Sequence, residues 1–198
     1  MRIAYVSNTN PFDINNWSGT PHYLIAALQK HHEVVWIGGG TINGAFWHHR
    51  FLHREKRYNL LDYSTDICRI ISAAINEGRF DAVISATFSM CSRLEIDIPL
   101  IAFCDLTYSL CNEYLRKSPS HLRVRSMREE ERFLQSADAV VYSSELAKIS
   151  ALFDYDVPVD KFHVLDFGAN IPAPADVHPE DFDDDICRLV FVGLRCYL

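Results

Sequence analysis

The residues of this 198-residue chain that best suit chemistry are polar side chains that follow short apolar runs. Ser18, Gly19 and Thr20 lie in the loop after residues 3–6, directly before a proline at position 21 that suits a first helical turn. Free N–H groups and the helix dipole at such a turn favour a phosphate. An ordinary helix cap explains the same residues equally well, because one glycine is a weak signal and neither G-x-G-x-x-G nor G-x-x-x-x-G-K-[ST] is present.

A second candidate is the loop after the apolar run of residues 99–103. Asp105 follows this run, and Thr107 and Tyr108 come next. A carboxylate in that position could bind a ligand hydroxyl or take part in proton transfer. A loop aspartate that caps the following turn is an equally good explanation.

Two more apolar runs end in polar residues. Thr87 and Ser89 follow residues 81–86, and their hydroxyls could hydrogen-bond a polyol or belong to a turn. Ser144 and Glu145 follow residues 139–142, where a helix cap is the stronger interpretation.

Three histidines stand close together in an aromatic and basic segment, residues 41–58, to which the sequence assigns no regular structure. His49 and His53 are four residues apart, and with His48 they could bind a metal if the segment were helical. No cysteine is close, and a loop that lines a binding face or folds over the sheet edge is the better interpretation. No G-x-S-x-G elbow and no Ser-His-Asp set is evident, and nucleophilic hydrolysis is not supported.

The elements that must position these residues are short strands alternating with helices. Strands that are apolar on both faces predict a mostly parallel, doubly wound, Rossmann-like α/β sheet covered on both sides. Ligands of such sheets bind outside the carboxyl ends of the strands, where the candidate loops lie. The predicted strands are residues 3–6, 33–37, 58–61, 81–86, 99–103, 139–142 and 162–165.

Helical periodicity is clear in three segments. Residues 65–78 place apolar side chains at positions i, i+3, i+4, i+7 and i+8 from Ile67, and a glycine ends the pattern. Residues 20–28 also have helical spacing, and Ser143 or Ser144 caps a further predicted helix that extends through residue 152. Residues 121–135 predict a charged amphipathic helix with an imperfect apolar side, formed by Leu122, Val124, Met127 and Phe133.

Composition bounds the class of protein. With 48% hydrophobic residues the chain can bury a sizeable core, and its net charge of −7 argues against affinity for nucleic acid or anionic lipid. The six cysteines form no C-x-x-C pair, so we expect them to be reduced and the protein to be cytoplasmic. No stretch approaches the ~18 apolar residues of a transmembrane segment, and the N-terminus lacks the apolar core of a signal peptide.

The sequence predicts one domain and the start of another. Residues 1–170 hold the alternating elements. Residues 171–186 are rich in proline and acidic residues, a composition typical of an exposed linker. Residues 187–198 have the strand-then-glycine form with which a doubly wound domain begins, so we expect the first strand of a second domain there.

Three motifs in this order resemble a known family. They are W-S-G-T-P-H-Y at residues 17–23, A-D-A-V-V-Y-S-S-E-L-A-K at 137–148 and K-F-H-V-L-D-F-G-A-N-I at 161–171. Together they resemble the N-terminal half of GT-B glycosyltransferases, and most closely the retaining, nucleotide-sugar-dependent family 4 enzymes. The resemblance extends over residues 1–193.

The resemblance implies roles for the candidate residues. Gly19 would approach the phosphates of the donor, with Ser18 and Thr20 beside it, and Asp105 would face an acceptor hydroxyl in the interdomain cleft. The nucleotide-sugar would be a substrate, the acceptor a carbohydrate or a lipid-linked molecule, and neither a cofactor nor a metal is expected. Further acceptor-side candidates are Thr107, Tyr108, His22, Thr87, Ser144 and Glu145.

The resemblance also implies a half that this sequence does not contain. The family continues past Gly193 with basic residues and a pair of glutamates that hold the donor, whereas residues 194–198 end the sequence here. We therefore expect an acceptor-binding domain that transfers no sugar alone. One chain of a split glycosyltransferase and a non-catalytic binding module are the alternatives. A nicotinamide-dinucleotide domain is disfavoured, because glycines follow the second predicted strand rather than the first.

Overall fold

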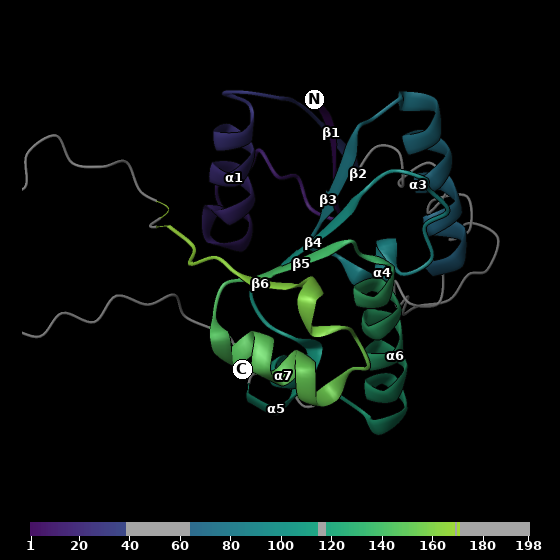
Figure 1. Ribbon diagram of the computed structural model, residues 1–198, viewed down its shortest axis with the longest axis vertical. Coiled ribbons are helices and arrows are strands. Elements are labelled where there is room, and N and C mark those ends of the chain that lie inside the picture. Colours follow the sequence, from purple (N-terminus) through teal and green to yellow (C-terminus); the bar gives the residue numbers. More distant parts are fainter. Residues whose placement is uncertain (39–63, 115–117, 169, 171–198) are drawn as a thin grey trace, which may run out of the picture.

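The computed structural model describes residues 1–38, 64–114, 118–168 and 170, which build one parallel sheet with helices against it (Figure 1). The six strands pair in parallel in the order β2-β1-β3-β4-β5-β6. This confirms the predicted Rossmann-like α/β class. The strands are β1 (Arg2–Ser7), β2 (Glu33–Gly38), β3 (Ala82–Ser85), β4 (Leu100–Cys104), β5 (Ala139–Tyr142) and β6 (Phe162–Val164).

The helices include all four that the sequence predicts and two short ones that it does not. The helix α4 spans four residues and α5 spans seven, which is too short for a hydrophobic period to be recognisable. The elements are η1 (Asn16–Gly19), α1 (Thr20–Leu28), α3 (Ser64–Gly78), α4 (Phe88–Cys91), α5 (Tyr108–Tyr114), α6 (Ser120–Ser136), α7 (Glu145–Asp154) and η3 (Val159–Lys161).

Some predictions fall outside the described residues. These are the strand at residues 58–61, the histidine-containing segment, the linker at residues 171–186 and the strand within residues 187–198. In the part of the chain that the structure describes, no helix is long and apolar enough to span a membrane.

Two apolar clusters hold the helices to the two faces of the sheet. Alternate residues of each strand point to opposite faces, so Ala4 and Val6 belong to the cluster that includes residues of α3, α4, α6 and α7, whereas Ile3 and Tyr5 belong to the cluster of Ile25 of α1. Figure 1 shows α1 on one side of the sheet and α3, α4 and α6 on the other. The segment that follows β1 therefore runs to one face of the sheet, and the segment that follows β3 runs to the other face.

The predicted apolar side of residues 121–135 holds for Phe133, which is buried, and for Met127, which packs against the core, but not for Val124. Val124 is 49% exposed, whereas Glu129 and Glu130 are buried beside Phe133. Buried charge is tolerated where it is paired and hydrogen-bonded, and both the turn after α4 and α6 itself supply the partners of Glu129.

Glu129 is the centre of a polar cluster that joins α6 to the end of α4. Its Oε1 lies 2.7 Å from Arg93 Nη2 and 2.6 Å from Arg132 Nη1, and its Oε2 accepts a 2.7 Å hydrogen bond from Ser92 Oγ. Burial raises the pKa of Glu129, but hydrogen bonds from Arg93 and Ser92 and the two positive charges leave it below its ordinary value. The carboxylate is therefore ionised at neutral pH.

We expect Glu129→Gln to lower the free energy of unfolding by about 1–2 kcal/mol, because it removes the charge that two partly exposed arginines share. Urea unfolding at pH 7 measures the loss. Glu77→Gln on the exposed face of α3 is the matched control and should change stability little. Equal stability of the two variants would contradict a structural role for the cluster.

Candidate functional site

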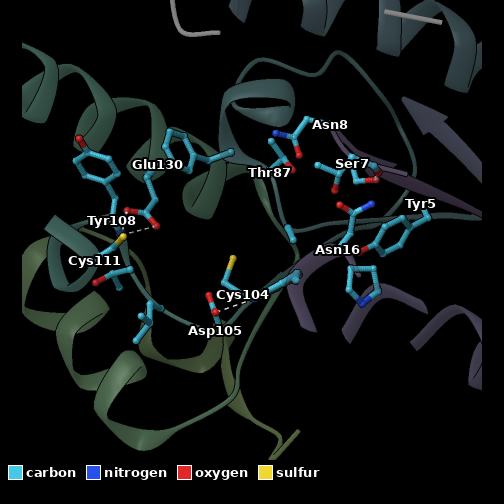
Figure 2. Close-up of a pocket in the computed structure, with 17 residues that line it drawn as sticks. Tyr5, Ser7, Asn8, Asn16, Thr87, Cys104, Asp105, Tyr108, Cys111 and Glu130 are labelled. Carbon is cyan, nitrogen blue, oxygen red and sulfur yellow. Dashed lines mark hydrogen bonds between the residues drawn. The ribbon is translucent and has the colours of Figure 1, made fainter. Parts of the chain in front are cut away.

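A cavity of about 440 Å³ opens at the carboxyl ends of β1, β3 and β4 (Figure 2). Its position follows from the strand order. β1 pairs with β2 on one side and β3 on the other, and the loops after β1 and β3 lead to opposite faces of the sheet. The strand order therefore reverses between β1 and β3, at what is called a topological switch point. The diverging loops leave a crevice there, and ligands of open parallel sheets bind in such crevices.

Asp105 lies in this cavity, directly after β4. Its Oδ2 accepts a 2.9 Å hydrogen bond from Trp17 Nε1, and its backbone carbonyl accepts one from Ser143 Oγ. No hydrogen bond from the described residues reaches Oδ1. The carboxylate is thus fixed by one oxygen and has the other available for a ligand donor.

Thr107 and Tyr108 line the same cavity, but their hydroxyls have different hydrogen-bond partners. Thr107 is fully buried, and its Oγ1 accepts from Leu110 N at the start of α5 and lies 2.8 Å from Ser150 Oγ. Its hydroxyl is therefore engaged inside the protein. Tyr108 donates its hydroxyl proton to Ser118 Oγ and packs its ring edge-on against Phe88, which forms an aromatic wall.

The turn around Gly19 lies next to the cavity rather than in its lining. Gly19 has φ +81° and precedes α1, and Trp17 and Ser18 also have positive φ values of 47° and 52°. The cavity reaches Trp17 but not Ser18, Gly19 or Thr20. The side-chain amide of Asn170 donates to Ser18 O and Thr20 Oγ1, both at 2.9 Å.

The remaining candidates separate into one that lines the cavity and four that do not, of which Ser89 is buried in α4. Thr87 lines it, at the end of β3. His22 lies outside, with Nδ1 3.1 Å from Phe12 O. Ser144 accepts from Ala147 N and caps α7, as the helix-cap alternative expects, and Glu145 is exposed in the first turn.

The sequence did not predict Glu130, a buried carboxyl that also lines the cavity. Both of its oxygens accept from Tyr108 N, at 2.8 and 3.1 Å, and Oε2 also accepts from the Tyr155 hydroxyl. Burial raises the pKa of Glu130 to about 7, although these hydrogen bonds oppose the shift. A signal was present, because Glu130 shares the helical stripe of Met127 and Leu134.

The rest of the lining is neutral. Ser7, Asn8, Thr9 and Asn16 contribute hydroxyls and amides, and no Lys, Arg or His is among the described residues that line the cavity. Hydroxyls, amides and a carboxylate can hydrogen-bond a hydroxylated ligand, and aromatic rings can cover its apolar face. These residues offer no positive charge to a phosphate.

The buried thiol of Cys104 also lines the cavity. Burial, followed by the nearby Glu130 and Asp105, raises its pKa well above the ordinary value, so the thiol is protonated at neutral pH. Within the described ranges, no group of three or more His, Cys, Asp or Glu residues could hold a metal ion.

The fold and the cavity define a Rossmann-like α/β domain with a cavity at its switch point. No family model and no curated protein matches the chain. Among solved structures, the chain is similar to the UDP-GlcNAc 2-epimerase from Neisseria meningitidis bound to UDP-GlcNAc, with 18% identity and a TM-score of 0.49. The match covers 83% of this chain and 45% of that one, so the chain spans less than half of its length. At this identity and TM-score, the similarity says nothing about reaction or ligand.

We expect Gly19→Ala to lower the free energy of unfolding by about 1–2 kcal/mol. A left-handed φ of +81° is unfavourable for alanine, and its Cβ would lie 3.3 Å from Tyr23 Cε2 and 3.4 Å from Ile14 Cγ1. Gly168→Ala is the control, because a Cβ there would meet nothing within 4 Å. Thermal unfolding of both variants measures the difference, and equal midpoints would contradict the strain argument.

Glu130→Gln should remove a pH dependence of stability. The carboxyl binds its proton more tightly in the folded chain, with a pKa of about 7 against the ordinary 4.5. Its contribution is complete below about pH 4.5 and is lost as the pH rises through 7. The free energy of unfolding of the unsubstituted protein should therefore fall by roughly 2–3 kcal/mol from pH 5 to pH 8 through this residue, and the variant should lack that fall.

Urea unfolding at pH 5 and pH 8 measures this difference. Glu129→Gln is the matched control, because the pKa of Glu129 is lowered and its carboxylate stays ionised throughout this range. That variant should lose similar stability at both pH values. If Glu130→Gln kept the full decline of the unsubstituted protein, another group would be responsible for it.

Proposed function

We propose that this domain binds the acceptor of a nucleotide-sugar-dependent glycosyltransferase of the GT-B type. The observation that carries the proposal is the carboxylate of Asp105, held by Trp17 in a cavity whose other accessible polar groups are mostly neutral. A carboxylate with one engaged oxygen can accept a hydrogen bond from a sugar hydroxyl and fix its orientation. Motifs that resemble family 4 enzymes support the same assignment.

The charge of the lining favours an acceptor over a donor in this cavity. A nucleotide-sugar carries a diphosphate, which proteins neutralise with Arg, Lys, a metal or a helix N-terminus. The described lining has Asp105 and Glu130 and no basic side chain. A neutral hydroxylated molecule fits these groups better than a diphosphate does.

Transfer itself would require the donor to be held against the acceptor, since alignment of two reactants supplies much of the rate enhancement. In the proposed arrangement this domain orients the acceptor hydroxyl through Asp105. Developing charge on the donor would be stabilised from the donor-binding half of a GT-B enzyme.

A second candidate function is binding of a saccharide without transfer. The absence of basic side chains from the described lining favours it, because such a cavity can hold a sugar without a nucleotide. The two functions differ in turnover. Because this domain alone is expected to transfer no sugar, the difference shows only when a donor-binding half is supplied. Saccharide-dependent release of nucleoside diphosphate from a panel of nucleotide-sugars, in a mixture with a chain that carries a family 4 donor-binding half, would support the acceptor domain, whereas saccharide binding without release in that mixture would favour the binding module.

Asp105→Asn should weaken saccharide binding about tenfold, because it replaces a charge-assisted hydrogen bond with a neutral one. Titration calorimetry with a panel of mono- and disaccharides measures the affinity. The control is Asp160→Asn in the exposed η3, far along the chain from the cavity loops. Unchanged affinity in Asp105→Asn, or tight binding of a free nucleotide with no saccharide binding, would contradict acceptor binding in this cavity.

A further inference from the structure

The loop that carries Trp17 is held in a conformation that its own residues do not favour. Trp17, Ser18 and Gly19 are consecutive residues with positive φ, and only the glycine adopts that region without cost. Each of the other two costs about 1–2 kcal/mol. Contacts from elsewhere in the structure must therefore stabilise the loop.

Asn170 supplies two of these contacts from the far end of the described chain. Its amide nitrogen donates to the carbonyl oxygen of Ser18 and to the hydroxyl of Thr20, so it bridges the residues on both sides of Gly19. The side chain of Asn170 thus satisfies a backbone acceptor within the strained turn and a side-chain acceptor at the start of α1.

Phe167 supplies a third contact, through aromatic packing. Its ring stacks on Phe103 with a centroid distance of 4.7 Å and an angle of 11°, and it meets Trp17 edge-on at 6.2 Å. Trp17 and Phe103 also pack edge-on at 6.4 Å. The indole is therefore enclosed by a ring from β4 and a ring from the segment that ends in Asn170.

The enclosed indole points its Nε1–H at the cavity carboxylate, 2.9 Å from Asp105 Oδ2. We propose that Asn170 and Phe167 are positioning residues for Asp105, which act by fixing the turn and the indole of Trp17. Neither residue lines the cavity, so their effect on a ligand is indirect. The inference rests on the proposed function only for the identity of the ligand, and the contact can be tested without one.

The indole resonances of the ¹⁵N-labelled protein report on this chain of contacts. The sequence holds three tryptophans, and Trp17→Phe identifies the resonance of Trp17. Asp105→Asn should move that resonance, because it removes the charged acceptor. Asn170→Ala should move it upfield and speed its exchange with solvent several-fold, as loss of the hydrogen bond requires.

The resonance of Trp36 is an internal reference for folding, because its Nε1 donates to Ser7 O and not to the turn. Asn76→Ala is the matched control, since the Asn76 amide also donates to a backbone carbonyl, that of Glu95. It should leave Trp17 unchanged. Should Asn170→Ala fail to fold, Thr20→Val removes one of the two bonds and should give a smaller shift in the same direction.

Phe167→Leu should shift the Trp17 resonance with Trp36 unchanged, because it removes the edge-on ring contact. A Trp17 resonance that stays in place in both Asn170→Ala and Phe167→Leu overturns the proposal. A Trp17 resonance that is unchanged in Asp105→Asn also overturns the proposal.

Saccharide titration of the same variants separates this proposal from the proposed function. Asn170→Ala should bind several-fold more weakly than the unsubstituted protein, and equal affinity would overturn the positioning role. If the unsubstituted protein binds no saccharide but Asn170→Ala moves the indole, the proposed function fails and the positioning of Asp105 stands.

Discussion

The site depends on one topological constraint, the reversal of strand order at β1. The chain places β2 on one side of β1 and returns to place β3 on the other, so the helices that follow β1 and β3 lie on opposite faces. The loops between these strands and helices cannot close over the sheet edge together. The cavity, the access to Asp105 and the exposure of the aromatic walls follow from that divergence.

Polar groups buried behind the cavity give its rim a defined shape. Glu130 accepts from the backbone of Tyr108 and from the Tyr155 hydroxyl, so one carboxyl ties α6 to the start of α5 and to the residue that follows α7. Glu129 joins α6 to the end of α4 in the same way. A buried carboxyl without such partners would be strongly unfavourable, and these bonds therefore fix how the helices meet.

Much of the fold could be predicted from the sequence, because buried parallel strands are apolar on both faces and stand out from the helical segments between them. On the predicted apolar side of residues 121–135, Phe133 is buried as predicted, but Val124 is exposed and the buried Glu129 was missed. The helical periodicity considers only apolar residues. It gives no sign that Arg93 and Ser92 will pair with Glu129 and so allow a carboxylate into the core. The helices α4 and α5 were too short to carry a period at all.

The sequence by itself determined the layers of the domain and the loops in which a site would lie, since a strand followed by polar residues identifies a sheet edge. The tertiary structure alone decided which side chains meet there. Asp105 and Trp17 are 88 residues apart in the chain, and Asn170 is 152 residues from Ser18. Contacts at such separations arise from the order and pairing of strands, and no local pattern of residues encodes them.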